Sequence, residues 1–177
     1  MTDEAKLIEN ENGRCPGGGG WFVLNVADAR CWKNERFGRY ASFEGSEHRF
    51  PQCGINVHVL LPGQPNCLYH RENQQEDFLV LSGECVLVVE GQERPLKAWD
   101  FVHCPPETTH VFVGAGDGPC AILMMGARLA EEAITYPVDE VAGARGASAE
   151  RETHVPSEAY ASSPKWEPGR PAWPTER

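Results

Sequence analysis

The sequence predicts an all-β protein, built as a sandwich or barrel of short antiparallel strands. Between residues 21 and 127, short runs rich in Val, Ile, Leu and Phe alternate with Gly, Pro, Asn and Asp, a pattern typical of such folds. No helix-length amphipathic stretch interrupts these runs, which argues against a parallel α/β sheet. With 177 residues, 41% of them hydrophobic, the chain can form one folded domain with a real core.

The first twenty residues are expected to be a flexible N-terminal segment. They are polar and end in Cys15-Pro16 and the four glycines of residues 17–20. A phosphate-binding loop is not expected there, because Trp21 and Phe22 follow the glycines where such a loop has a Lys-Ser/Thr pair. The expected β-barrel spans residues 21–127.

Within the barrel, two tight turns are expected to form hairpins. They are Ser82-Gly83-Glu84 and Glu90-Gly91-Gln92. The strands are expected over residues 21–26, 37–43, 55–61, 77–81, 85–90, 100–104, 110–113 and 121–125.

Residues 128–177 differ from the barrel in composition. Short helices are expected at residues 138–145 and 157–161, followed by an extended, proline-rich tail with Trp166 and Trp173. A solvated tail rarely carries two tryptophans, so we expect it to lie across the barrel or a partner subunit. Plain disorder of the tail is the alternative.

The charge of the chain disfavours some partners. Its 26 acidic and 16 basic residues give a net charge of −10, which argues against nonspecific binding to nucleic acid or to an anionic membrane.

No apolar run approaches the roughly 20 residues that cross a bilayer. The polar N-terminus does not resemble a secretory leader, and the seven cysteines are odd in number. We therefore expect a cytoplasmic protein with reduced thiols.

Histidine and carboxylate side chains recur where barrel strands would bring them together. His70 and Glu72 are two residues apart and share a face of an extended strand. Glu76 opens the next expected strand, and His110 opens a later one after Pro105-Pro106. Two neutral imidazoles and one or two carboxylates on adjacent strands can hold one divalent first-row metal ion. Coordination positions left open would take water or substrate.

Each of these residues also has a structural interpretation. A lone histidine at the start of a strand, such as His110, is usually a surface or capping residue. Glu72 could face solvent and pair with Arg71 or Arg94. Glu76 could be a structural acid that accepts a backbone hydrogen bond, but its burial without a cation would be unfavourable.

Two further histidines are candidates for proton transfer. His58 shares a strand face with Asn56 and could line the same cavity, as a proton carrier or as a replacement ligand. His103, just before Cys104-Pro105, has the same two possibilities. Either could instead form hydrogen bonds outside the cavity.

Around these residues the sequence resembles the cupin superfamily, as a small single-domain member. The first cupin motif joins a Gly, a His-x-His pair, a Glu and a later Gly. The positions that fall on it are Gly63, His70, Glu72, Glu76 and Gly83. The second motif joins a Gly, Pro-x-Gly, a His and an Asn. The positions that fall on it are Trp99, Pro105, Glu107, His110 and Gly114.

The resemblance covers about residues 55–125 and implies an antiparallel jelly-roll β-barrel with a metal ion inside. It implies His70, Glu76 and His110 as ligands of a divalent ion, Zn, Mn, Fe or Ni. Glu72 stands where the family has its second histidine and is the expected fourth ligand. Non-glycine residues stand at two glycine positions of the second motif, Trp99 and Glu107.

Two classes of function follow. In the first, the protein is a metal-dependent enzyme acting on a small polar molecule by oxygenase, isomerase or lyase chemistry. In the second, it is a binding or sensing module that holds a small molecule without turnover. A homodimer is expected in either case, because antiparallel barrels with exposed strand edges often pair.

Overall fold

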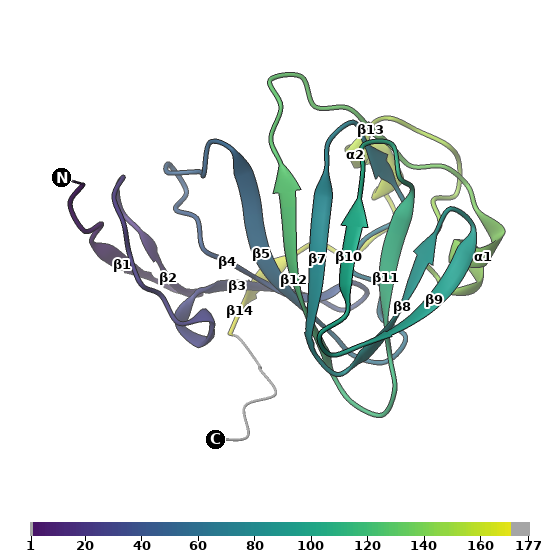
Figure 1. The fold of residues 1–177 in the computed structure, drawn as a ribbon, viewed down its shortest axis with the longest axis horizontal. Helices are drawn as coiled ribbons and strands as arrows, with labels where there is room; N and C mark the ends of the chain where they lie inside the picture. The colour runs from purple at the N-terminus through teal and green to yellow at the C-terminus, as the bar shows by residue number, and fades with distance from the viewer. Residues whose placement is uncertain (1, 171–177) are drawn as a thin grey trace.

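The chain folds into antiparallel β-sheets, with two short helices in its C-terminal part (Figure 1). The computed structural model describes residues 2–170. Within these residues, fourteen strands form a seven-stranded sheet, a three-stranded sheet and two two-stranded sheets. All pairings between these strands are antiparallel. The predicted all-β antiparallel class is therefore confirmed.

Strands far apart in the sequence lie side by side in both main sheets. The seven-stranded sheet has the order β10 (Phe101–Cys104), β7 (Glu76–Ser82), β12 (Cys120–Ala127), β5 (Cys53–Leu60), β4 (Gly38–Ser42), β3 (Arg30–Asn34) and β14 (Glu167–Gly169). The three-stranded sheet has the order β11 (His110–Ala115), β8 (Glu84–Val89) and β9 (Gln92–Lys97). The two small sheets pair β1 (Leu7–Asn10) with β2 (Gly13–Pro16), and β6 (Arg71–Glu72) with β13 (Ile134–Thr135).

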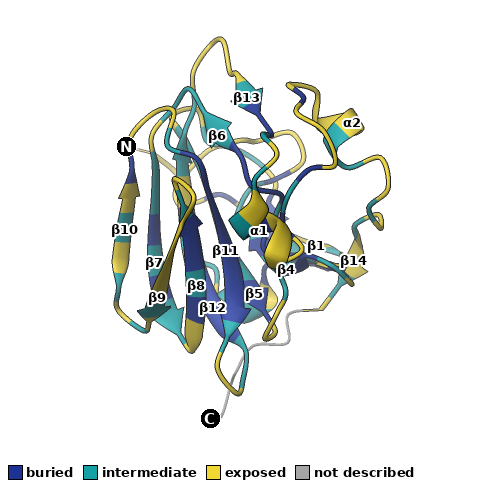
Figure 2. Ribbon diagram, turned by 90° about the vertical axis from the view of Figure 1, so that its right-hand side faces the viewer, coloured by how far each residue is buried: buried dark blue, intermediate teal, exposed yellow. Residues whose placement is uncertain are grey.

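The two main sheets share one apolar core. Phe78 of β7 and Ile122 of β12 come from the large sheet, and Leu87 of β8 and Phe112 of β11 come from the small one. Alternate residues of a strand point to the same face, so these strands direct every second side chain inward. Figure 2 shows the buried stretches of β8, β11 and β12 that result.

The C-terminal segment covers the outer face of the small sheet. Helix α1 (Glu140–Ala144) begins at Asp139, whose carboxylate accepts the N–H of Ala142 at 2.8 Å. Ala142 packs against Val88 and Val111, so both faces of β11 are buried. Helix α2 (Pro156–Ala159) follows. Both helices lie where the sequence predicts them, within one or two residues at each end.

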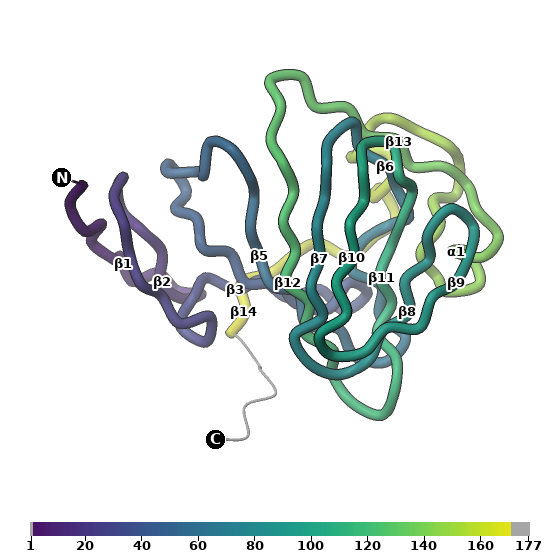
Figure 3. Tube along the Cα trace, in the orientation of Figure 1, coloured from purple at the N-terminus to yellow at the C-terminus, as the bar shows by residue number. Residues whose placement is uncertain are grey.

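The start of the tail lies across the barrel, as expected. The ring of Trp166 packs against Tyr40 and Phe37, with centroid distances of 4.8 and 6.5 Å. Strand β14 then pairs with β3 at the edge of the large sheet (Figure 3). Trp173 lies outside the described residues. None of the helices that the structure describes is long and apolar enough to span a membrane.

One predicted hairpin is confirmed and one is wrong. Val89 pairs with Gln92 across Glu90 and Gly91, whose φ angles of 49° and 69° form the expected tight turn. Gly83 instead carries the chain from the large sheet to the small one, because β7 and β8 belong to different sheets. Its φ is 73°, and a Cβ there would lie 2.4 Å from a backbone oxygen, so only glycine fits this crossing.

The N-terminal part also differs from expectation. The strand predicted over residues 21–26 is wrong: Trp21 forms only an isolated bridge, and the Asn25 side chain caps a 3₁₀ turn at Val26–Asp28. The segment expected to be flexible contains the β1–β2 hairpin. The backbone of Asn12 in its turn accepts the N–H of Cys31 at 2.9 Å, which ties the hairpin to β3.

Candidate metal centre

His70 and His110 lie opposite each other on neighbouring backbone segments. The N–H of His70 donates to the carbonyl of His110 at 3.2 Å, and the reverse bond is 2.8 Å. Opposed residues of an antiparallel pair point to the same side, and here the ring centroids are 5.1 Å apart. Glu76, the first residue of β7, reaches the same point. One ligand atom from each of the three residues lies within 4.8 Å of the other two.

A backbone carbonyl fixes the tautomer of each imidazole. Nδ1 of His70 is 2.9 Å from the carbonyl of Leu68, and Nδ1 of His110 is 3.0 Å from that of Thr108. A carbonyl can only accept, so Nδ1 carries the proton and Nε2 of the neutral ring presents its lone pair. Metal-binding histidines are oriented by the same kind of second hydrogen bond.

The C-terminal segment supports the loop that carries His70. The N–H of Leu68 donates to the hydroxyl of Tyr160 at 3.1 Å, and the N–H of Tyr69 donates to the carbonyl of Ala147 at 2.7 Å. Leu68 itself is fully buried. Because the carbonyl of Leu68 accepts a hydrogen bond from Nδ1 of His70, the position of this imidazole depends on contacts with residues 147 and 160.

Both Nε2 atoms face carboxylate oxygens. The distance is 3.5 Å from His110 to Glu76 and 3.6 Å from His70 to Glu72. An imidazole lone pair and a carboxylate oxygen are both acceptors and repel each other unless a proton or a metal cation lies between them. Two imidazole nitrogens and one carboxylate oxygen are a donor set that divalent first-row ions accept. The three residues therefore fit a metal ion.

Burial shifts the pKa values of these groups strongly. It raises the pKa of Glu76 to about 8, and the neighbouring Glu72 carboxylate contributes to the rise. It lowers the pKa of His110 to about 4, with a smaller contribution from His70. The pKa of His70 is also lowered by burial. At neutral pH both rings are neutral, and Glu76 keeps a proton that a bound cation would displace.

The three residues line a cavity of about 220 Å³ between the sheets. Phe78 and Met124 form part of its wall and are buried. Its other lining side chains are polar or charged, apart from Met125 and Ala127: Arg49, Asn56, Asn66, Gln74, Arg128 and Glu132. The arrangement can hold a cation next to a space for a small molecule.

Glu72 lies beside this cluster but outside it. One of its carboxylate oxygens is 3.6 Å from Nε2 of His70, and the other accepts the amide N–H of Gln74 at 2.5 Å. Its side chain lines a neighbouring cavity, which shares Gln74 and Glu132 with the cavity of His70, Glu76 and His110, the candidate metal cavity. Its expected part as a fourth ligand stays a prediction.

The two histidines considered for proton transfer do not line the cavity. His58 stacks on Tyr40, with ring centroids 5.5 Å apart, and burial lowers its pKa to about 4. His103 is on the edge strand β10, half exposed, with Nδ1 2.6 Å from the carboxylate of Asp77. Asn56, on the strand of His58, does line the cavity. A role of either histidine in proton transfer stays a prediction.

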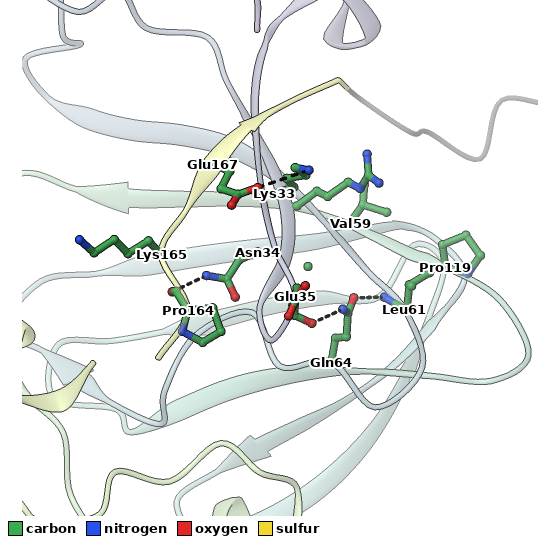
Figure 4. Close-up of a pocket in the computed structure, with 12 residues that line it drawn as sticks. Lys33, Asn34, Glu35, Val59, Leu61, Gln64, Pro119, Pro164, Lys165 and Glu167 are labelled. Atoms are coloured by element: carbon green, nitrogen blue, oxygen red, sulfur yellow. Dashed lines mark hydrogen bonds and ion pairs between the residues drawn. The ribbon is translucent and has the colours of Figure 1, made fainter. Parts of the chain in front are cut away.

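A larger cavity, of about 630 Å³, lies against the opposite face of the large sheet (Figure 4). Several of its polar side chains already have partners, which makes it a weaker candidate for a ligand site. These pairs are Gln64 with Leu61 and Glu35, Asn34 with Pro164, and Lys33 with Glu167.

Five charged or polar residues that line the candidate metal cavity were not anticipated: Arg49, Asn66, Gln74, Arg128 and Glu132. Gln74 stands between Glu72 and Glu76, so its place inside the first motif was an available signal. Arg49 belongs to the connection between β4 and β5, and Arg128 follows β12. No sequence pattern marks these two arginines, because only the folded barrel brings the ends of β5 and β12 to the cavity.

Comparison with known proteins supports the predicted family. Residues 56–126 match the family model described as "Cupin domain". No curated protein matches the chain. A sugar phosphate isomerase of the cupin superfamily from Silicibacter pomeroyi is 24% identical, with a TM-score of 0.57 over 67% of this chain and 87% of that chain.

Two other solved structures are also similar. A predicted oxalate decarboxylase from Thermotoga maritima is 20% identical, with a TM-score of 0.52 over 60% of this chain and 99% of that chain. A protein from Acidithiobacillus ferrooxidans is 28% identical over 47% of this chain, with a TM-score of 0.45. This chain covers 55% of the length of that protein.

The family match and the fold refer to the same part of the chain. The matched residues 56–126 run from β5 to β12 and include all three candidate metal ligands. The two structures with TM-scores of 0.57 and 0.52 share the fold of the barrel. Residues 56–126 of this chain match a cupin domain, and the barrel that contains them has the cupin fold.

Proposed function

We propose that this cupin domain binds one divalent ion, Zn, Mn, Fe or Ni, through Nε2 of His70, Nε2 of His110 and the carboxylate of Glu76. The observation that carries the proposal is the convergence of these atoms within 4.8 Å, with both imidazole tautomers set for coordination. When bound, such an ion acts as a Lewis acid that polarises a substrate oxygen.

We further propose that the protein is an enzyme whose substrate is a small polar molecule in the cavity. Phe78 and Met124 limit the access of water, and the polar residues opposite them orient the substrate. Glu132 is an exposed carboxylate that lines the cavity outside the three-residue cluster, and it can accept and return a proton. Oxygenase, isomerase and lyase chemistry all fit such a site.

Metal content tests the first part of the proposal. Protein purified without added metal should contain close to one equivalent by elemental analysis, and His110→Ala and Glu76→Ala should lose it. His103→Ala is the matched control and should keep its metal, because this histidine lies outside the cavity. Circular dichroism checks that the variants fold. Unchanged metal content in both cavity variants would show that the ligand set is wrong.

The same measurement on Glu72→Gln tests the fourth ligand. A ligand carboxylate cannot be replaced by an amide without loss of metal affinity, whereas a neighbouring carboxylate can. Lower occupancy in this variant would support ligation by Glu72, and full occupancy would restrict the set to three residues.

Turnover distinguishes the enzyme from a binding module. The metal-loaded protein is incubated with mixtures of sugars and hydroxy acids, and substrate loss is followed by NMR. An enzyme should convert at least one compound, and Glu132→Gln should slow that reaction while metal content is unchanged. Binding without any conversion would favour the non-catalytic alternative.

A further inference from the structure

We infer that the metal cavity takes a small anion that also carries hydroxyl groups, with Arg49 binding the anionic group and Asn56 and Gln74 accepting from the hydroxyls. This inference rests on the proposed function and specifies its substrate class. Its evidence is the hydrogen-bonding state of the cavity residues that are not candidate metal ligands.

Gln74, which lines the cavity, carries an unpaired acceptor. Its Nε2 donates to the carboxylate of Glu72 at 2.5 Å. A carboxylate oxygen accepts, so this bond fixes the orientation of the amide and places Oε1 on the other side. Oε1 is buried and has no donor among the residues that the structure describes. A buried carbonyl oxygen is unfavourable without a donor, and a ligand hydroxyl would supply one.

Asn56 presents a second acceptor from another element. It lies on β5, between Met124 of β12 and Ser42 of β4, and its side chain lines the cavity. Its Oδ1 is also buried and finds no donor within residues 2–170. Two unpaired acceptors in one cavity point to a ligand with at least two donor groups.

Arg49 supplies positive charge to the same cavity. Its side chain lines the cavity from an exposed position, and it forms no hydrogen bond through its side chain and no ion pair with the described residues. Arg128, the other arginine there, is already bound: its guanidinium holds the Glu44 carboxylate at 2.7 and 2.9 Å and donates to the carbonyl of Phe50. The charge of Arg49 contributes to the lowered pKa of Glu44, but its guanidinium donors have no partner among the described residues and suit a carboxylate or a phosphate.

The volume of the cavity limits the size of the ligand. One water molecule occupies about 30 Å³ of liquid, so about 220 Å³ corresponds to about seven water-sized groups. The ligand is therefore small, with any longer part extending past Arg49.

Calorimetric titration of the metal-loaded protein tests this inference with four probes. D-Glycerate carries a carboxylate and two hydroxyls, and glycerol 3-phosphate replaces the carboxylate by a phosphate. Glycerol lacks the anion, and propionate lacks the hydroxyls. We expect one of the first two to bind at least about tenfold more tightly than glycerol or propionate. Whichever of D-glycerate and glycerol 3-phosphate binds more tightly shows whether the anionic group is a carboxylate or a phosphate.

Two variants assign the contacts. Arg49→Met should weaken the tighter probe roughly 10- to 100-fold, the usual effect of losing a charge-assisted hydrogen bond, while metal content stays the same. Gln74→Leu should weaken that probe by a few-fold and leave propionate binding unchanged. Arg94→Met is the matched control, since this exposed arginine of β9 is outside the cavity, and it should bind like the wild type.

The outcomes separate this inference from the proposed function. If the wild type holds its metal but neither hydroxylated anion binds better than glycerol, the inference is overturned and the metal site stands. Wild-type affinity in Arg49→Met would overturn it as well. If the wild type holds no metal, the proposed function fails and the inference fails with it.

Discussion

At the scale of single residues, the carboxyl of Glu76 should couple the proposed metal centre to pH. It is buried beside a second carboxylate, and the pKa rises to about 8 for this reason. The imidazoles of His70 and His110 supply no compensating charge, because burial keeps both rings neutral at pH 7. The carboxyl group therefore holds a proton in the metal-free protein and gives it up when a cation binds.

Metal affinity should depend on pH in a defined direction. A raised pKa means that the folded metal-free protein favours the protonated form below about pH 8, so metal must displace one proton there. The affinity should rise about tenfold per pH unit up to about pH 8 and then level off. Competition titrations with a chelator between about pH 6 and 9 would measure this.

Proton release provides an independent check on the same group. Calorimetry at pH 7 in buffers of different ionisation enthalpy should report close to one proton released per metal ion bound. An affinity that is flat between about pH 6 and 8, with no proton released, would contradict the assignment of the proton to Glu76.

At the scale of elements, two turns have a backbone conformation that their residues do not favour. Trp99 and Glu107 stand where the cupin motif has glycine, and their φ angles are 76° and 70°. The turn at Glu107 matters for the site, because its N–H donates to the carbonyl of Glu72 at 2.7 Å. The backbone thus keeps the shape of the motif although the glycines are absent.

Replacing Glu107 by glycine should stabilise the protein. A non-glycine residue in the left-handed region is strained by about 1–3 kcal/mol, while the greater freedom of glycine in the unfolded chain offsets about 0.4–1 kcal/mol. The ion pair with Arg71 at 3.3 Å is exposed and contributes little. We expect the free energy of unfolding to rise by about 1 kcal/mol, measured by urea denaturation.

The matched control is Glu131→Gly. This residue is an exposed glutamate in a loop, and its φ is not positive. Glycine there adds freedom to the unfolded chain and removes no backbone strain, so the free energy of unfolding should fall slightly or stay unchanged. A loss of stability in Glu107→Gly similar to that of the control would disprove the strain argument.

At the scale of the whole molecule, β10 forms one edge of the large sheet and β14 forms the other. Among the strands that the structure describes, β10 pairs with β7 alone. Two exposed aromatic residues lie at this edge: 65% of the surface of Phe101 and 76% of that of Trp99 is accessible. Unpaired edges and exposed aromatic groups favour association, so we propose that two copies of the chain pair here.

Light scattering after size exclusion tests the dimer. The wild type at micromolar concentration should have twice the mass of the chain, and Phe101→Glu should have the mass of one chain. Val138→Glu introduces the same charge at another exposed apolar residue and should remain a dimer. A monomeric wild type would exclude the proposal, and a dimeric Phe101→Glu would place the interface elsewhere.

Local patterns in the sequence were enough for the class of the fold and for the three clustered ligand candidates. Alternating apolar residues and turn residues act over a few positions, so most barrel strands and the Glu90-Gly91 turn could be predicted from them. The spacing of His70 and Glu76 in the first motif, and of His110 in the second, is equally local. Only the tertiary structure decided how the two motifs meet.

Pairing between distant strands could not be obtained from local patterns, because it depends on which faces are buried together. The tertiary structure placed β7 and β8 in different sheets, although Ser82-Gly83-Glu84 has the composition of a hairpin turn. It left His58 against Tyr40 and brought Arg49 and Gln74 into the metal cavity. The sequence by itself determined which chemical groups the barrel carries, and the packing of its sheets decided which of them meet.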